Sequence, residues 1–391
     1  MESISDFNIK GLPKIIFGEG KFSSLPAIIS SYGSNALIFI GGKSLKKAGR
    51  LNEFVRQLHQ AQIKYKGVSV WNEPATEVID SIVSQIRKTP VDVVVAIGGG
   101  SVIDFGKAVS AMLAADGSVK DYLEGVGTKK PNGAKIPFIA VPTTAGTGCE
   151  ATKNAVICDR KEGYKKSLRH DAYMPDVALV DPALTLTLPT YITTASGLDA
   201  VSQLVEAYTS TKADVSLDSL VLKALSYASE SLLPLALGKS NDISLREKMS
   251  YAALVSGIAL NRSGLGAVHG IAGPLGGLFP VPHGIACGKL LFPVMTFVIK
   301  KIGDEKNIAA QKRFADIGRI FTGEAGGDDI FYCKQFLSTL DKWTRTLKLP
   351  QLSRFGMTAL HMEKTIAISD SKNSPALLSK ENIKVILEVI R

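Results

Sequence analysis

The first half of the chain alternates short apolar runs with amphipathic stretches. The apolar runs include "NALIFI", "VDVVVAIGGG" and "KIPFIAVPTT", and stretches with helical periodicity lie between them at residues 51–62 and 78–87. Such runs are typical of strands, and their alternation with helices is typical of βαβ units in a mainly parallel sheet. We therefore expect residues 1–185 to form an α/β domain with ligand sites at the carboxyl ends of its strands.

The second half shows a different pattern. After "VALVDPALTLTLP" the strand-like runs stop and longer helical periodicities begin. A chain of 391 residues is also long enough for two domains, each with its own core. We therefore expect residues 186–391 to form an all-helical domain. The expected helices span residues 196–210, 216–233, 245–260, 309–321 and 328–347.

The composition is that of a folded globular protein, with 45% hydrophobic residues. Its formal net charge of +10 comes from dispersed lysines rather than from a basic stripe interleaved with aromatics, which disfavours nucleic acid as a partner. The apolar stretches are too short for a membrane span, and the segment "MESISDFNIKGLPK" lacks the pattern of a secretory signal. We expect a cytoplasmic protein. Its four cysteines, Cys149, Cys158, Cys287 and Cys333, are expected to be buried core residues.

Two turns rich in glycine and hydroxyl groups follow predicted strands. The strand "VDVVVAI" runs into Gly98, Gly99 and Gly100, where the backbone can approach a ligand closely, and Ser101 can cap the next helix. The amino terminus of that helix would attract a pyrophosphate. A second turn, "VPTTAGTGCEAT", offers the hydroxyl groups of Thr143, Thr144 and Thr147. Two such turns at strand ends favour a dinucleotide cofactor.

Four side chains, two of them on one predicted helix, are candidate metal ligands. The segment "GLGAVHGIAGPLGGLFPVPHG" holds His269 and His283, two of the five histidines of the chain. Asp199 and Gln203 are four residues apart on a predicted helix and so project from one face. Two oxygen donors and two imidazoles form a mixed ligand set that suits Zn²⁺ or Fe²⁺ and leaves room for a substrate oxygen.

Other catalytic signatures fail on the same letters. Gly42, Lys43 and Ser44 resemble the end of a phosphate-binding P-loop, but the glycine required five positions before Gly42 is Leu37. The sequence contains neither G-x-S-x-G nor H-E-x-x-H, so it supports neither a hydrolase triad nor a zincin.

The motifs "GGGSVID", "VPTTAGTGCE", "GLDAVSQLVEAYTS" and "AVHGIAGPLGGLFPVPHG" occur in an order and at spacings that resemble the iron-containing (type III) alcohol dehydrogenase family. The resemblance covers nearly the whole chain. It implies a dehydroquinate synthase-like architecture, with an N-terminal α/β dinucleotide domain and a C-terminal helical domain. It also implies NAD(P), one divalent metal, Fe²⁺ or Zn²⁺, in the cleft between the domains, and usually a homodimer.

Carried over residue by residue, the resemblance places metal ligands on Asp199, His269 and His283. The family's third ligand histidine falls on Gln203, whose amide oxygen can still coordinate. A further family histidine, which assists proton transfer, falls on Gly273. The proton is then expected to leave through the cofactor ribose hydroxyl and water, with His170 as a weaker candidate.

The cofactor preference is predicted from one short segment. Family members selective for NAD commonly carry an acidic residue after the strand that matches "ALIFI", where it meets the adenosine ribose. This chain has Gly41, Gly42, Lys43 and Ser44 there, so no carboxylate repels a 2′-phosphate and we favour NADP(H). The residues expected to contact the cofactor are Gly41, Gly42, Lys43, Ser44, Gly98, Gly99, Gly100, Ser101, Asp104, Thr143, Thr144, Thr147 and Lys166.

The predicted reaction is hydride transfer between an alcohol carbon and the nicotinamide. A small or medium aldehyde and its primary alcohol are the family's usual substrates. An alternative is a sugar acid, because Gln203 and Gly273 resemble the pattern of family members linked to oxidation of the terminal hydroxyl of Kdo. Two other classes stay open: a dehydroquinate synthase-like lyase, and a non-catalytic binding protein that has lost a metal ligand.

Overall fold

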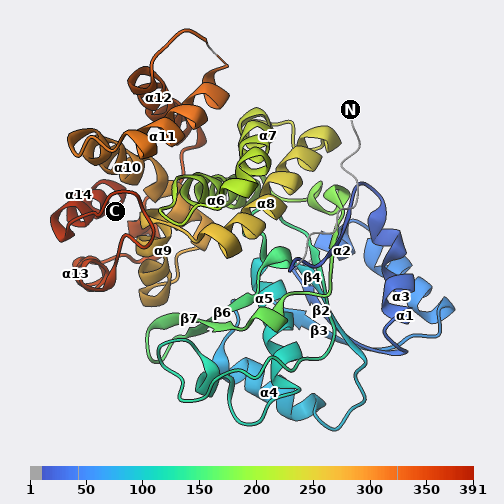
Figure 1. The fold of residues 1–391 in the computed structure, drawn as a ribbon. Coiled ribbons are helices and arrows are strands. Elements are labelled where there is room, and N and C mark those ends of the chain that lie inside the picture. The colour runs from blue at the N-terminus through green and yellow to red at the C-terminus, as the bar shows by residue number, and fades with distance from the viewer. Residues whose placement is uncertain (1–10, 43, 324) are drawn as a thin grey trace. The chain divides into compact units, whose positions relative to one another are not determined.

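The computed structural model of the chain describes residues 11–42, 44–323 and 325–391. These residues form two compact units (Figure 1). The first unit comprises the described residues up to 144 together with 148–188 and 241–250, and the second comprises 145–147, 189–240 and 251–391. Among the helices of the described residues, none combines the length and the apolar character needed to cross a membrane.

The first unit is built on a six-stranded parallel sheet with the strand order β1-β8-β5-β4-β2-β3 (Figure 1). The alternating apolar runs of the sequence thus form the parallel sheet that they predict. The strands are β1 (Lys14–Phe17), β2 (Asn35–Gly41), β3 (Lys64–Val70), β4 (Val93–Gly98), β5 (Phe138–Pro142) and β8 (Val177–Val180).

The central strand β4 explains why these runs are apolar throughout. Val94 and Ala96 belong to a core cluster on one face of the sheet, whereas Val93, Val95 and Ile97 belong to the cluster on the other face. Successive side chains of a strand point to opposite faces, so a strand covered on both sides must be apolar at every position. All six residues of β4 are buried as a result.

Helices cover this sheet, and a separate antiparallel hairpin completes the unit. The helices are α1 (Leu25–Ser30), α2 (Ser44–Lys47), α3 (Arg50–Gln60), α4 (Thr76–Ile86) and α5 (Gly100–Met112). The hairpin consists of β6 (Asn154–Asp159) and β7 (Tyr164–Arg169). Sequence reasoning missed it because β7 carries mostly half-buried polar side chains, which resemble a solvated loop.

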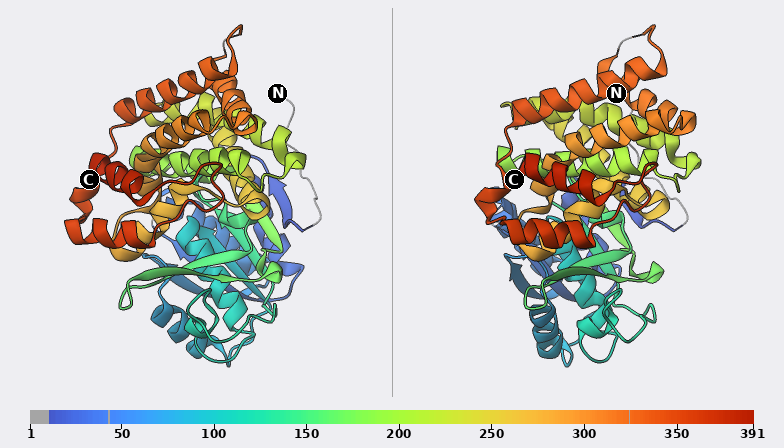
Figure 2. Two further views of the ribbon diagram at one scale, coloured as in Figure 1. Left: turned by 60° about the vertical axis from the view of Figure 1, so that its left-hand side comes forward. Right: turned by 90° about the vertical axis from the view of Figure 1, so that its left-hand side faces the viewer.

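The second unit is helical, and no strand follows β8 in the part of the chain that the structure describes. The expected fold class, an α/β unit followed by an all-helical unit, is therefore confirmed. Helix α13 packs against α9, and α14 packs against α10 (Figure 2). The helices are α6 (Thr190–Thr209), α7 (Asp218–Ala236), α8 (Ile243–Ser263), α9 (Ala267–Leu278), α10 (His283–Asp304), α11 (Ile308–Thr322), α12 (Asp329–Leu347), α13 (Ala359–Ile368) and α14 (Lys380–Ile390). The first residues of α8, up to 250, belong to the first unit.

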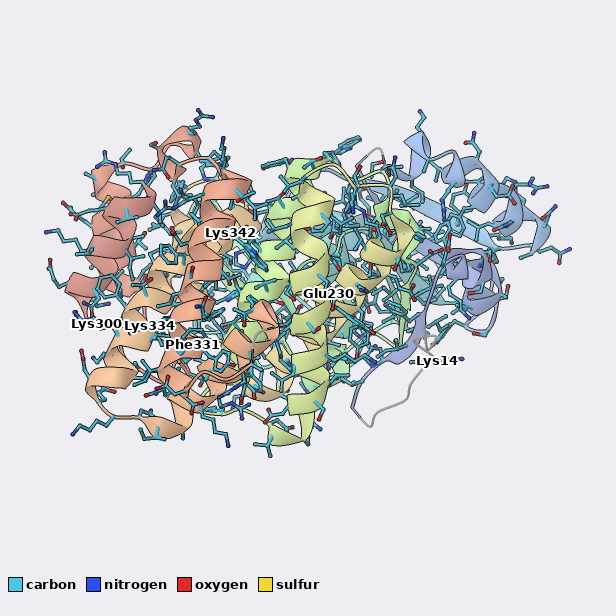
Figure 3. All side chains as sticks on the ribbon, turned by 90° about the horizontal axis from the view of Figure 1, so that it is seen from above. Lys14, Glu230, Lys300, Phe331, Lys334 and Lys342 are labelled. Carbon is cyan, nitrogen blue, oxygen red and sulfur yellow. The ribbon has the colours of Figure 1, made fainter. Side chains whose placement is uncertain are left out.

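Exposed lysines lie along the surface of this helical unit. Lys300 projects from α10, and Lys334 and Lys342 project from α12 (Figure 3). They sit on the polar faces of helices whose opposite faces are buried, as in Phe336 and Trp343 of α12. Their positions are those of ordinary solvated residues on amphipathic helices.

Candidate functional site

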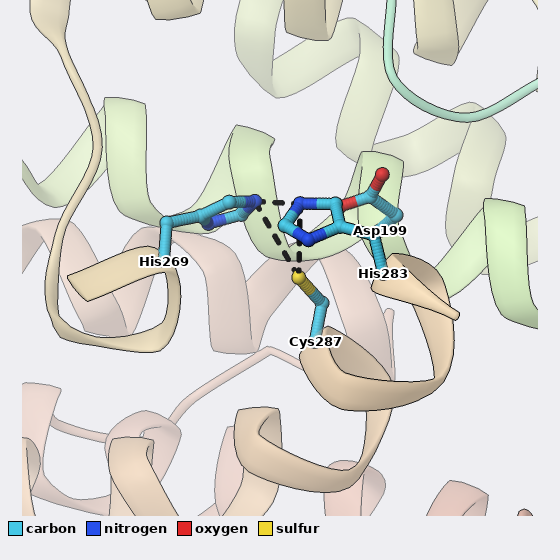
Figure 4. A group of neighbouring side chains, drawn as sticks. All are labelled: Asp199, His269, His283 and Cys287. Atoms are coloured by element: carbon cyan, nitrogen blue, oxygen red, sulfur yellow. Dashed lines mark hydrogen bonds and ion pairs between the residues drawn. The ribbon is translucent and has the colours of Figure 1, made fainter. Parts of the chain in front are cut away.

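Three helices of the second unit, α6, α9 and α10, bring the candidate ligands together. Asp199 lies in the middle of α6, His269 lies in the first turn of α9, and His283 is the first residue of α10. His269 Nε2 lies 3.3 Å from Asp199 Oδ1, and His283 Nε2 lies 3.7 Å from the same oxygen (Figure 4). Three of the four ligands expected from the sequence therefore share one site.

Cys287 is the fourth member of this cluster, and sequence reasoning missed it. Its Sγ lies 3.6 Å from the Nε2 atoms of both His269 and His283 (Figure 4). The donor atoms of Asp199, His269, His283 and Cys287 all lie within 4.8 Å of one another. Cys287 is buried, as expected for a core residue. The available signal was its position four residues after His283, which places both side chains on one face of α10.

Glu206 contacts the His269 ring nitrogen that faces away from Asp199, and sequence reasoning missed it as well. It follows Asp199 by seven residues, two turns along the same face of α6. Its Oε2 lies 2.6 Å from His269 Nδ1, and its Oε1 accepts a hydrogen bond from the Val268 N–H. A histidine that donates Nδ1–H to a carboxylate presents Nε2 to a metal, and such a partner orients the ring and raises its basicity.

Gln203 is buried on the same face of α6. Its Oε1 accepts a hydrogen bond of 2.7 Å from the Ser256 hydroxyl of α8. The amide oxygen is therefore engaged by a neighbouring helix, and coordination of a metal by Gln203 stays a prediction.

Burial and neighbouring charged groups have opposite effects on the pKa values of Asp199 and His269. It raises the pKa of the Asp199 carboxyl, but His283 and His269 outweigh it and hold that pKa below its ordinary value. Burial raises the pKa of the Cys287 thiol to about 12. Burial lowers the pKa of His269, but Cys287 and Glu206 together raise it well above the ordinary value. A metal ion must therefore displace protons here, so its binding weakens as the pH falls.

Glycines let α10 lie close to α6. A Cβ added at Gly284 would collide with the Ala195 carbonyl oxygen, and one added at Gly288 would meet the Leu198 side chain at 2.7 Å. Gly270 likewise lies against the Asp370 backbone. By contrast, a Cβ added at Gly273 would meet nothing within 4 Å. The glycine-rich segment is therefore needed largely for close helix packing, and space is left at Gly273.

Replacing Gly284 with alanine is expected to destabilise the helical unit and to reduce its metal content. The added methyl group forces the start of α10, with His283, away from α6, and overpacking of this kind costs about 1–3 kcal/mol. Urea denaturation and metal analysis measure the two effects. Gly303→Ala is the matched control, because it lies on α10 where a Cβ meets nothing within 4 Å. Equal stability and equal metal content in both variants would contradict this packing role.

The residues expected to bind the cofactor lie mostly in the first unit. Gly99 caps α5 at the end of β4, Gly100 and an exposed Ser101 are the first two residues of that helix, and the turn after β5 holds Thr143 and Thr144. The expected capping of α5 by the Ser101 side chain is therefore wrong, because Ser101 lies inside the helix. Gly98 of β4 pairs in register with Pro142 of β5, so these two turns are neighbours at the carboxyl edge of the sheet. A Cβ at Gly99 would lie 3.2 Å from Thr144. Thr147 belongs to the second unit.

The remaining cofactor candidates have different surroundings. Gly41 and Gly98 both pack against Val102, with which an added Cβ would collide. Gly42 has a left-handed backbone, with φ of +59°. Ser44 begins α2, Lys43 lies outside the described residues, and Lys166 is half-buried on β7.

Asp104 and Lys107 are buried on α5. Asp104 Oδ2 accepts a hydrogen bond from the Val156 N–H, so it holds β6. Lys107 Nζ donates to the carbonyl oxygens of Cys149, Thr152 and Asn154. Lys107 thus ties the segment after the second turn to the helix that follows the first turn. Sequence reasoning did not single out Lys107.

Comparison with known proteins agrees with this arrangement. The family model for iron-containing alcohol dehydrogenase matches residues 13–182, and the C-terminal model of the Fe-containing alcohol dehydrogenase family matches residues 193–390. The chain is 32% identical to the probable alcohol dehydrogenase EutG of Escherichia coli K12 over 332 residues, which cover 84% of this chain and 80% of that protein. It is 30% identical to long-chain-alcohol dehydrogenase 1 of Geobacillus thermodenitrificans, with 95% and 93% covered.

A solved structure leads to the same family. The alcohol dehydrogenase ADH/D1 from an archaeal halo-thermophilic Red Sea brine pool source superposes with a TM-score of 0.87. The two are 27% identical, and the match covers 98% of each chain. With both family models matched, the chain belongs to the iron-containing alcohol dehydrogenase family.

Proposed function

We propose that this alcohol dehydrogenase interconverts an alcohol and its aldehyde with NAD(P) and one divalent metal. The observation that carries the proposal is the cluster of buried Asp199, buried His269 and half-buried His283 in a chain of this family. In the reaction, a hydride passes between the alcohol carbon and the nicotinamide, and the hydroxyl proton passes to solvent.

The side chains present suit a divalent metal. Asp199 offers a carboxylate oxygen, and His269 and His283 offer imidazole nitrogens, all within the reach of one ion. When bound, the metal would act as a Lewis acid on the substrate oxygen, where it stabilises negative charge. Gln203 is the fourth ligand expected from the sequence.

Glu206 and Asp199 orient and charge the site so that it can bind a cation. Glu206 holds His269 by Nδ1 and so directs Nε2 toward Asp199. Asp199 supplies negative charge in a fully buried position, where the attraction for a cation is strong. Gly273 provides no side chain for proton transfer, so we assign this step to the cofactor ribose hydroxyl and water. His170 is less suited, because its Nδ1 accepts the Ala172 N–H as a helix cap.

NADP(H) is expected to be used at least as efficiently as NAD(H). The segment after β2 presents glycine, lysine and serine rather than a carboxylate that would repel a 2′-phosphate. Steady-state kinetics with each cofactor measure kcat/KM for the two. A preference for NAD(H) of about tenfold or more, corresponding to ~1.4 kcal/mol, would refute this expectation.

The substrate class is tested with a panel of alcohols, aldehydes and sugar acids. Small or medium primary alcohols are expected to be oxidised. The space at Gly273 favours a sugar-acid alcohol as the second candidate, since it leaves room for a bulkier polar substrate. A steady net change in NADPH absorbance supports the dehydrogenase, because a dehydroquinate synthase-like lyase regenerates its cofactor in every turnover. Failure with every substrate of the panel would count against the proposed function.

We also propose a homodimer, which light scattering can test.

A further inference from the structure

We propose that Cys287 supplies a thiolate ligand and completes an Asp199–His269–His283–Cys287 metal site in place of Gln203. This proposal deepens the proposed function and rests on its metal centre. It differs from the expected ligand set of two oxygens and two imidazoles, because one oxygen is replaced by sulfur.

Four of the six distances between the donor atoms lie close to those around a single tetrahedral ion. With bonds of about 2.0 Å to oxygen and nitrogen and about 2.3 Å to sulfur, tetrahedral zinc separates nitrogen from sulfur by ~3.6 Å and nitrogen from oxygen by ~3.3 Å. Cys287 Sγ lies 3.6 Å from the Nε2 atom of each histidine. Asp199 Oδ1 lies 3.3 Å and 3.7 Å from the same two atoms. Cys287 Sγ therefore lies at the distance from each histidine that a shared tetrahedral ion requires.

Gln203 is less suited to that corner. Its Oε1 is engaged by the Ser256 hydroxyl at 2.7 Å, within a fully buried pair. Coordination would cost this hydrogen bond or divide the lone pairs of the amide oxygen between two partners. Cys287 instead gives up a proton, and no other side chain has to move, because its sulfur already faces both imidazole nitrogens (Figure 4).

Coordination exchanges the thiol proton of Cys287 for the metal ion. The S–H bond of Cys287 breaks, a metal–sulfur bond forms, and the proton passes to solvent. The Asp199 carboxylate and the Cys287 thiolate, both buried, then bring two negative charges, which neutralise a divalent cation. A soft sulfur ligand combined with imidazole favours zinc over harder cations. We therefore infer that zinc is the better fit to this chain's ligand set.

Cobalt substitution tests the proposal through a signal that is independent of activity. Metal-free protein is loaded with Co²⁺, and near-ultraviolet absorption is recorded for a sulfur-to-cobalt charge-transfer band. The wild type and Gln203→Ala are expected to show the band, whereas Cys287→Ser is expected to lose it. Cys333→Ser, a buried cysteine whose Sγ contacts the Gln311 carbonyl oxygen, is the matched control and is expected to keep the band. Zinc affinity of Cys287→Ser should fall by at least about tenfold, the loss typical even of residues that only support a ligand.

X-ray absorption on zinc-loaded wild type provides a test without mutation. One sulfur scatterer at about 2.3 Å is expected beside nitrogen and oxygen at about 2.0–2.1 Å. A shell of nitrogen and oxygen alone, or a charge-transfer band that survives in Cys287→Ser, would overturn the thiolate ligand while leaving the metal centre intact. Wild type that binds neither cobalt nor zinc would overturn both. A sulfur-ligated metal in a protein inactive on every alcohol would sustain this proposal and overturn the proposed function.

Discussion

Asp199→Ala is expected to leave the protein without bound metal and without measurable turnover. Asp199 Oδ1 is the atom that both histidines of the cluster face, and the carboxylate is 1% exposed. Removing it takes away a negative charge that attracts the cation where water cannot replace it. Loss of Lewis-acid stabilisation amounts to several kcal/mol, so we expect kcat to fall by about a thousandfold or more.

Elemental analysis after dialysis and steady-state kinetics measure these effects together. Asp199→Asn keeps the size of the side chain and should lose metal almost as completely, which separates charge from packing. Asp304→Ala, an exposed position at the end of α10, is the control and should keep both metal and activity. An Asp199→Ala protein that retains its metal and its turnover would show that the proposed ligand set is wrong.

Glu206→Gln is expected to weaken zinc binding by about 10–100-fold, although Glu206 does not belong to the proposed ligand set. The carboxylate is the partner of His269 Nδ1 at 2.6 Å and also accepts the Val268 N–H. A glutamine keeps the shape but removes the charge that makes the imidazole a better donor. Competition with a chromogenic chelator measures the zinc dissociation constant.

The control for this variant is Glu230→Gln on α7. Glu230 is exposed on the surface of that helix and is not a member of the cluster (Figure 3). The zinc affinity of the Glu230→Gln protein should equal that of the wild type. Equal affinity in Glu206→Gln as well would mean that Glu206 is a packing residue rather than one that tunes His269.

The parallel sheet was predictable because every strand of its centre is a continuous apolar run. Residues of β4 face helices on both sides of the sheet, so no polar position interrupts the pattern. The hairpin β6–β7 was not predictable in the same way, since its second strand is rich in lysine and only half-buried. Helix α9 was hidden by its glycines and by Pro274, which have low helix propensity; of these, Gly270 is required by close packing against the Asp370 backbone.

The site was predictable in part. The grouping of Asp199, His269 and His283 followed from their side-chain chemistry and from the resemblance to a family. Cys287 was missed because cysteines were considered only for spacing among themselves, and not for their spacing to histidine. The same four-residue step that relates Asp199 to Gln203 relates His283 to Cys287. Whether Gln203 or Cys287 faces the cluster depends on helix packing, which a single sequence does not show.

Metal removal and reconstitution test whether alcohol oxidation depends on a metal ion bound at the Asp199 cluster. Purified protein is stripped with a chelator, and alcohol-dependent reduction of NADP⁺ is followed as zinc or Fe²⁺ is added back. We expect no turnover in the stripped protein and a rise that reaches its plateau at about one ion per chain, as binding of one ion at the Asp199 cluster requires. Full activity without metal would contradict it, and so would restoration of metal without any net formation of NADPH.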